Sequence, residues 1–315
     1  MVTSSRIPGV LVAVLFVVVV VVLALSSATH VPDASSGATT SPSAPANPRP
    51  SGEYGPHRPA DASANPSLEA IPTHTAFELP PSDFPPVPPA AAELGPQAVL
   101  QANTLYAHQP PTLSGCPLPA TTQGEEEWHD AVRRQWDCVH VAWAPLFAAQ
   151  GWSTSKPTVH FYPGAGSESP CGYFEAPAFY CSVDGGTVYF GSEHLKMATS
   201  WELSVNEMVN HEYSHHIQLV SGISGAWGEA APESGLLRSE LQAICWSAMM
   251  TFHNQSVDFD HEDWESWNQR LQTMRESDAH GTREVLVEWG TRGLYAGTVG
   301  DCNTWTTPEL AVALG

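Results

Sequence analysis

The chain has 315 residues, of which 42% are hydrophobic and 14% charged, and 33 acidic residues against 12 basic ones give it a formal net charge of −21. A surface with this acidic excess repels phosphate backbones, which excludes a nucleic-acid partner. Most prolines lie before residue 120, whereas all six cysteines and all 11 tryptophans follow residue 97. The chain therefore consists of zones that its average composition does not describe.

Residues 1–28 contain an unbroken apolar run from Val10 to Leu25, and Arg6 is the charged side chain nearest to it. The run is longer than most signal-peptide cores and, with the residues before it, approaches the roughly 20 residues that span a bilayer. We expect a single-pass transmembrane anchor with an extracellular C-terminal domain. The alternative is a secretory signal cleaved after the small residues Ser26–Ala28, which releases a secreted protein.

Residues 29–97 are rich in proline, alanine and serine and show neither helical nor strand periodicity. Such a composition buries too little apolar surface to offset the entropy of the chain, and proline stiffens the backbone toward polyproline II. We expect a disordered, extended linker.

Residues 98–315 are long enough for one well-buried domain. Segments rich in valine, threonine and aromatic residues predict strands at 157–162 and 186–190. Apolar residues at helical spacing predict helices at about 125–150, 201–221, 233–253 and 264–276. The predicted fold class is α+β.

The six cysteines are an even number in an exported domain, which favours disulfide bonds. None of them has a partner at the short spacing of a structural zinc site. Six cysteines allow 15 pairings, and the sequence alone does not choose among them. Pairing of neighbours along the chain favours Cys116–Cys138, Cys171–Cys181 and Cys245–Cys302.

The segment His211-Glu212-Tyr213-Ser214-His215 has the pattern H-E-x-x-H. On a helix, residues four apart share one face, so both imidazoles reach one metal ion. Glu212 adjoins the first ligand and is placed to accept a proton from a water molecule at the metal. The alternative is that the two histidines are satisfied by ordinary hydrogen bonds within the fold.

A catalytic zinc ion takes three protein ligands and leaves a fourth position to water. The extended H-E-x-x-H-x-x-G-x-x-H motif, which would supply a third histidine, is absent here. Glu240 is the favoured third ligand because it lies in an apolar helical segment, where a carboxylate needs a partner or a metal. Arg238 is the alternative partner for that carboxylate. The other downstream candidates are Glu229, Glu233, His253 and His261.

These residues resemble the bacterial neutral zinc metallopeptidase family, whose members are zincins. The resemblance covers most of residues 98–315. It is carried by Cys171–Cys181, Val188–Phe190, His211–Gln218, Arg238–Cys245, His280–Thr282 and Cys302–Trp305, in the family's order. It implies a zincin-like fold and one Zn²⁺ ion held by His211, His215 and Glu240, with Glu212 as the catalytic residue.

The chain departs from the family pattern at Ile244, where the family usually has aspartate four residues after the ligand glutamate. By analogy with related zincins, that aspartate orients a zinc-binding imidazole. We expect Ile244 to approach the zinc site from the same helix face as Glu240. The imidazole then needs another acceptor, such as a main-chain carbonyl, water or Glu233, and without one activity falls.

Two further histidines are possible contributors. His280 precedes a glycine in a predicted loop and is a candidate donor to the oxyanion of the transition state, the alternative being a structural role. His216 points about 100° away from His215 on a helix, so we expect it to support the site from behind or to be structural. The acidic cluster Asp258–Glu265 is expected to be a solvated face.

Together these features predict a zinc-dependent endopeptidase that hydrolyses peptide bonds in peptides or proteins outside the cytoplasmic membrane. The alternative is a catalytically silent zinc-binding module displayed on a membrane-anchored stalk. Glu212 favours the enzyme, because a module that only binds has no need of a base, whereas Ile244 favours the silent module.

Overall fold

The computed structural model of the protein describes residues 77–91, 94–230, 232, 234–308 and 310. The expected anchor or signal at residues 1–28 and the expected linker up to residue 76 lie outside the described residues. Among the helices of the described part, none combines the length and the hydropathy needed to cross a bilayer.

Three long helices cross the middle of the domain: α2 (Glu125–Ala149), α4 (Ser204–Val220) and α6 (Gly235–Phe252). α4 contacts both α2 and α6, and α6 contacts α8 (Arg283–Arg292), which packs on α7 (His261–Thr273). The short helices are α1 (Gly95–Gln101), α3 (Ser192–Ala198) and α5 (Ile223–Ala230). The four helices predicted from apolar spacing are confirmed as α2, α4, α6 and α7.

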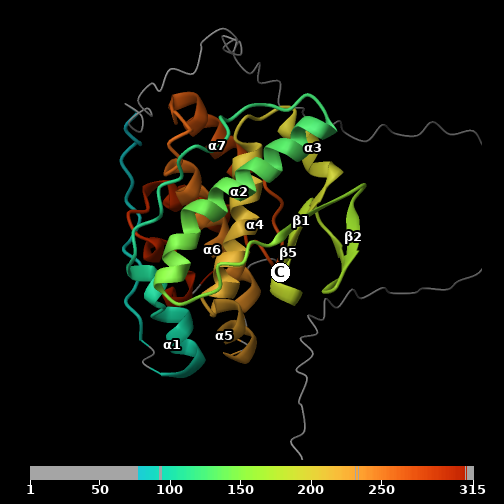
Figure 1. The fold of residues 1–315 in the computed structure, drawn as a ribbon. Helices are drawn as coiled ribbons and strands as arrows, with labels where there is room; N and C mark the ends of the chain where they lie inside the picture. The colour runs from blue at the N-terminus through green and yellow to red at the C-terminus, as the bar shows by residue number, and fades with distance from the viewer. Residues whose placement is uncertain (1–76, 92–93, 231, 233, 309, 311–315) are drawn as a thin grey trace, which may run out of the picture. The chain divides into compact units, whose positions relative to one another are not determined.

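Beside the helices lies a three-stranded sheet with the order β1 (Thr158–Tyr162), β5 (Thr187–Gly191), β4 (Ala178–Cys181) (Figure 1). β1 and β5 are parallel, whereas β4 is antiparallel to β5 and contacts α4. A separate hairpin joins β2 (Gly166–Ser169) to β3 (Gly172–Glu175). The two predicted strands are confirmed as β1 and β5, and the mixture of helices and strands agrees with the α+β prediction.

The core explains why α4 occupies its central place. Its apolar side chains recur at helical spacing and are buried: Val205, Met208, Val209, Tyr213 and Ile217. Six tryptophans elsewhere in the domain are each at most 2% exposed and supply much of the apolar area around it: Trp128, Trp136, Trp143, Trp246, Trp267 and Trp289. Burial of such large side chains is the main favourable term in folding.

Three disulfides join Cys116 to Cys138, Cys171 to Cys181 and Cys245 to Cys302, the pairs favoured by neighbour pairing. No free cysteine is found among the described residues. The second bond ties the β2–β3 hairpin to the end of β4. The third bond ties α6 to the 3₁₀-helix η4 (Val299–Cys302), across a separation of 57 residues.

The domain boundary expected after residue 97 is wrong, because the end of the proline-rich zone packs on the domain. The Arg292 guanidinium lies 5.1 Å from the ring centroid of Phe84 and donates to the carbonyl of Pro85 over 3.0 Å. The Tyr295 hydroxyl donates to the carbonyl of Pro80 over 2.5 Å. Proline lacks an N–H but keeps its carbonyl acceptor. The amino-acid composition of this segment did not reveal that residues far along the chain would contact and order it. The structured domain therefore includes residues 77–91.

We expect Phe84→Ala to lower the free energy of unfolding of the full-length protein by about 1–2 kcal/mol. The change removes the cation–π contact with Arg292 and the edge-on contact with the Tyr295 ring, whose centroid is 5.6 Å away. Urea unfolding measures the loss. The matched control is Leu94→Ala, because the Leu94 side chain is 88% exposed and should contribute little. Equal stabilities of the two variants would show that the proline-rich segment adds nothing to the fold.

Candidate metal centre

His211 and His215 are the partly exposed residues of α4 before its last two residues. From Ser204 to Gln218 every residue of the helix is buried except these two. Their four-residue spacing places both rings on the same face, with centroids 5.0 Å apart. The burial of the rest of the helix therefore directs the two imidazoles, and no other side chains of this stretch, toward the site.

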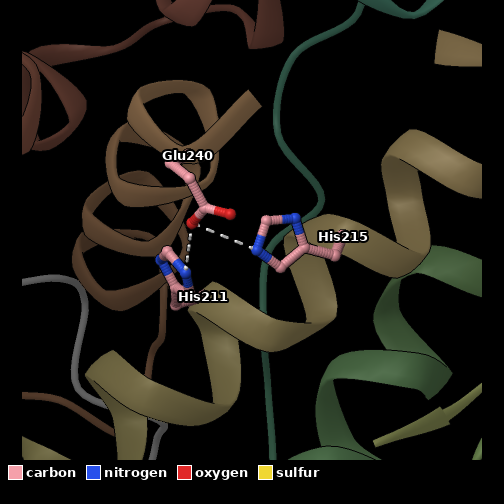
Figure 2. Close-up of side chains that lie close together, drawn as sticks. All are labelled: His211, His215 and Glu240. Atoms are coloured by element: carbon pink, nitrogen blue, oxygen red, sulfur yellow. Dashed lines mark ion pairs between the residues drawn. The ribbon is translucent and has the colours of Figure 1, made fainter. Parts of the chain in front are cut away.

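Glu240 reaches the same point from α6, which packs along α4 (Figure 2). Its Oε2 lies 3.3 Å from Nε2 of His211 and 3.5 Å from Nε2 of His215. The three side chains are 13%, 18% and 16% exposed in the order His211, His215, Glu240. Their potential ligand atoms all lie within 4.8 Å of one another. Two imidazole nitrogens and one carboxylate oxygen are a donor set of catalytic zinc in peptidases, so these residues fit the metal.

The alternative partner for Glu240 is engaged elsewhere. Arg238 donates through Nε to the hydroxyl of Ser234 over 2.9 Å and through its guanidinium to the carbonyl of Thr304. Neither contact involves Glu240.

The other candidate ligands are not brought to the two histidines. His253 contacts a main-chain carbonyl through Nε2 at 3.0 Å, and His261 pairs with a carboxylate of its own helix at 3.2 Å. Glu229 is exposed, and Glu233 lies outside the described residues. Among the described residues, Glu240 is the acidic side chain that completes the group.

The metal-free centre holds an ion pair. Burial opposes the charged form of His215, but the adjacent Glu240 carboxylate outweighs this effect and raises the pKa of His215 to about 9. Burial likewise opposes ionisation of Glu240, yet the neighbouring imidazoles hold its pKa well below the ordinary value. The carboxylate is therefore ionised at neutral pH and available to a cation.

Glu212 has the properties of a base rather than of a ligand. The residue is 3% exposed, and its Oε2 is buried without a hydrogen-bond partner among the described residues. Burial raises the pKa of Glu212, and the nearby His211 and His215 only partly oppose this shift. A buried carboxylate with a raised pKa is a better proton acceptor than an exposed one, which suits general base catalysis.

His280 approaches the centre from the loop between α7 and α8. Its Nε2 lies 3.6 Å from Oε2 of Glu240, and its Nδ1 lies 3.1 Å from the hydroxyl of Ser277. An isolated bridge between Ser277 and Gly281 closes the loop, and Gly281 has a φ of +82°, which favours glycine. Burial lowers the pKa of His280, so its imidazole is neutral at physiological pH.

His216 lies on the other side of α4. It is 1% exposed, and its Nδ1 lies 2.9 Å from the hydroxyl of Tyr180 in β4. Burial lowers the pKa of His216 to about 3, so the ring stays neutral. His216 thus joins the helix to the sheet and is not one of the grouped metal-binding side chains.

Ile244 belongs to the main hydrophobic core and is 4% exposed. The acceptor that faces Nδ1 of His215, at 3.0 Å, is instead Oε1 of Gln218. The sequence contained Gln218 within the zinc-helix block but gave it no role. Its spacing of three residues from His215 on a helix is the signal that could have identified it.

The comparisons with known proteins agree with this centre. A family model described as "Putative neutral zinc metallopeptidase" matches residues 107–305. This range includes every residue of the centre and all three disulfides. No solved structure matches the chain.

Curated relatives are 25% identical to this chain over the aligned residues. It is 25% identical over 207 residues to an uncharacterized protein of Mycobacterium tuberculosis, an alignment that spans 55% of this chain and 69% of the relative. It is also 25% identical over 192 residues to the uncharacterized protein YpfJ of Escherichia coli, spanning 52% of this chain and 66% of the relative. The family match covers more than half of the chain, which therefore belongs to the family described as putative neutral zinc metallopeptidases.

Proposed function

We propose that the protein is a zinc-dependent endopeptidase that hydrolyses peptide bonds outside the cytoplasmic membrane. The observation that carries the proposal is the convergence of His211, His215 and Glu240 beside the buried base Glu212. This combination supplies both a metal site and a proton acceptor next to it. Family membership supports peptidase activity in general, and the endopeptidase mode is our extension of it.

The residues divide the work of peptide hydrolysis among them. His211, His215 and Glu240 would hold the zinc ion, which when bound acidifies a water molecule and polarises the scissile carbonyl. Glu212 takes a proton from the attacking water and later gives it to the leaving amine. Its burial keeps bulk water from competing for that proton, and its raised pKa makes the second transfer easier.

His280 is placed to stabilise the negative charge that develops on the carbonyl oxygen. Its main-chain N–H donates to the Ser277 hydroxyl over 3.1 Å. The same hydroxyl can donate its own hydrogen to Nδ1, 3.1 Å away. When the hydroxyl donates in this way, the proton of the neutral ring is on Nε2, which lies 3.6 Å from Oε2 of Glu240. A preoriented donor of this kind typically contributes about 10²–10³-fold to the rate.

The silent zinc-binding module is the weaker alternative. A carboxylate with one oxygen, Oε2 of Glu212, buried without a hydrogen-bond partner among the described residues is destabilising. A protein that only displays zinc gains nothing from this arrangement, whereas a hydrolase needs it.

We expect Glu212→Gln to retain one zinc ion and to lose peptide hydrolysis, because an amide cannot accept the proton of the attacking water. His211→Ala, His215→Ala and Glu240→Ala should each lose the metal. Zinc content by atomic absorption and cleavage of a peptide library measure the two properties on the same samples. Undiminished hydrolysis by Glu212→Gln would contradict the assigned base, and stoichiometric zinc in Glu240→Ala would remove that residue from the ligand set.

Zinc uptake at about pH 7.5 should release about one proton, because metal-free His215 is still protonated below its pKa of about 9 and zinc binds only the neutral imidazole. The apparent affinity should therefore fall as the pH is lowered from 9. Calorimetric titrations in buffers with different ionisation enthalpies count the protons. Glu240→Gln checks the cause without zinc: it removes the charge that raises the pKa of His215, so an NMR titration of this variant should show a lower pKa for His215 than in the wild type. Uptake without proton release by the wild type would contradict the ion pair.

The full-length chain should remain in the membrane fraction with its C-terminal domain outside. The apolar run Val10–Leu25 after Arg6 motivates this proposal, and three disulfides suit an oxidising compartment. Carbonate extraction followed by protease accessibility tests both statements. A mature N-terminus at Thr29 would instead show signal cleavage and secretion.

A further inference from the structure

We infer that Gln218 is a positioning residue for the metal centre: its side-chain amide holds the hydrogen of His215 on Nδ1 and leaves Nε2 free for zinc. The inference rests on the proposed function, because it gives Gln218 a role toward one of the proposed zinc ligands. The relevant contact joins Oε1 of Gln218 to Nδ1 of His215 over 3.0 Å, across one turn of α4. Gln218 is 1% exposed, so water does not compete for this contact.

The contact alone does not say which group donates, because an amide and an imidazole can each do so. Ser239 of α6 removes the ambiguity. Nε2 of Gln218 lies 2.9 Å from the main-chain carbonyl of Ser239, which can only accept. The amide NH₂ group must therefore face Ser239, and the amide oxygen must face His215. Because that oxygen can only accept, His215 donates from Nδ1.

The hydroxyl of Ser239 strengthens this orientation by donating to the same Oε1 of Gln218 over 2.9 Å. A flipped amide would place its oxygen against the main-chain carbonyl of Ser239, where neither group can donate. In a buried site each lost hydrogen bond costs about 1–3 kcal/mol. The orientation of the Gln218 amide is therefore fixed by Ser239 independently of the metal.

A second amide extends the network to the C-terminal segment. Oε1 of Gln242 accepts from Nε2 of Gln218 over 3.2 Å and from the indole N–H of Trp305 over 3.3 Å. An indole N–H can only donate, so the orientation of Gln242 is fixed as well. Nε2 of Gln242 donates to the hydroxyl of Tyr106 over 3.1 Å and to the carbonyl of Cys302 over 3.4 Å.

The segment that supplies these outer contacts is itself anchored. Cys302 is bonded to Cys245 of α6, three residues beyond Gln242. Gln242 is 0% and Trp305 6% exposed. The direction of every hydrogen bond in the network thus follows from groups that can only donate or only accept. The last hydrogen bond of the network is the one to the His215 imidazole. This directed network is the physical basis of the role assigned to Gln218.

The test compares three variants of the full-length protein by zinc affinity and by thermal stability without metal. Gln218→Met keeps the side-chain volume but removes the acceptor, and the zinc dissociation constant should rise by about 10–100-fold. Gln218→Glu keeps an acceptor for His215 but loses both donors, so it should retain zinc affinity while losing stability. Gln242→Met is the matched control: it removes the same kind of side chain from the same network without touching His215. It should lower stability and leave zinc affinity near the wild-type value.

A spectrum of the cobalt-loaded protein provides a readout that a purely structural role would not move. Gln218→Met should shift the visible d–d bands, because the His215 ring is no longer held, whereas Gln242→Met should not. The inference is overturned if Gln218→Met binds zinc as tightly as the wild type, or if Gln242→Met weakens binding and shifts the bands equally.

The outcomes also separate this inference from the proposed function. A wild type that binds zinc but cleaves no peptide would refute the proposed endopeptidase and leave the role of Gln218 to be decided by the variants' affinities. A wild type that cleaves peptides while Gln218→Met keeps full zinc affinity would refute the role of Gln218 alone. A wild type that binds no zinc would overturn both.

Discussion

The packing of α4 against α6 is the constraint on which the centre depends, because neither helix carries a complete ligand set. Two glycines allow the close contacts that hold α6 against its other neighbours. A Cβ atom at Gly235, where α6 begins, would lie 1.8 Å from Nε1 of Trp227. A Cβ atom at Gly293, which starts the 3₁₀-helix η3 (Gly293–Tyr295), would lie 2.1 Å from the carbonyl oxygen of Cys245 in α6. The start of α6 and its contact with the C-terminal segment therefore fix where Glu240 meets the histidines of α4.

The sequence predicted those parts of the structure that depend on residues close together along the chain. Long apolar periodicity identified the main helices, and the four-residue spacing of the histidines identified the metal-binding face. It missed β2–β4, because strands of four residues are too short for a periodic signal, and Gly166–Ser169 has no apolar residue at all. It also missed the ordered segment 77–91. Its order comes from Arg292 and Tyr295, more than 200 residues further along the chain, which no local pattern reveals.

Burial raises the pKa of both glutamates of the site, but their net pKa shifts are opposite, which agrees with the two roles proposed for them. For Glu212 burial dominates and raises the pKa, so the side chain exchanges a proton readily. For Glu240 the adjacent imidazoles outweigh burial and lower the pKa, so the side chain stays ionised and suits a cation. In enzyme active sites, two carboxylates whose surroundings shift their pKa values in opposite directions commonly have different roles in the reaction. Neither role follows from residue type alone.

The neutral Gln218 then explains how the centre keeps its geometry without aspartate at position 244. An acceptor that orients an imidazole need not be charged. The oxygen of a neutral amide can accept the hydrogen bond of the imidazole and so orient the ring. A further carboxylate would raise the pKa of Glu212 beyond the increase that Glu240 already causes, because like charges oppose ionisation. It would also need partners in a region where Ile244 is packed among apolar side chains. In the proposed site two tasks are therefore separate: Glu240 would supply the negative charge that attracts the metal, and the Gln218 amide would orient the His215 ring.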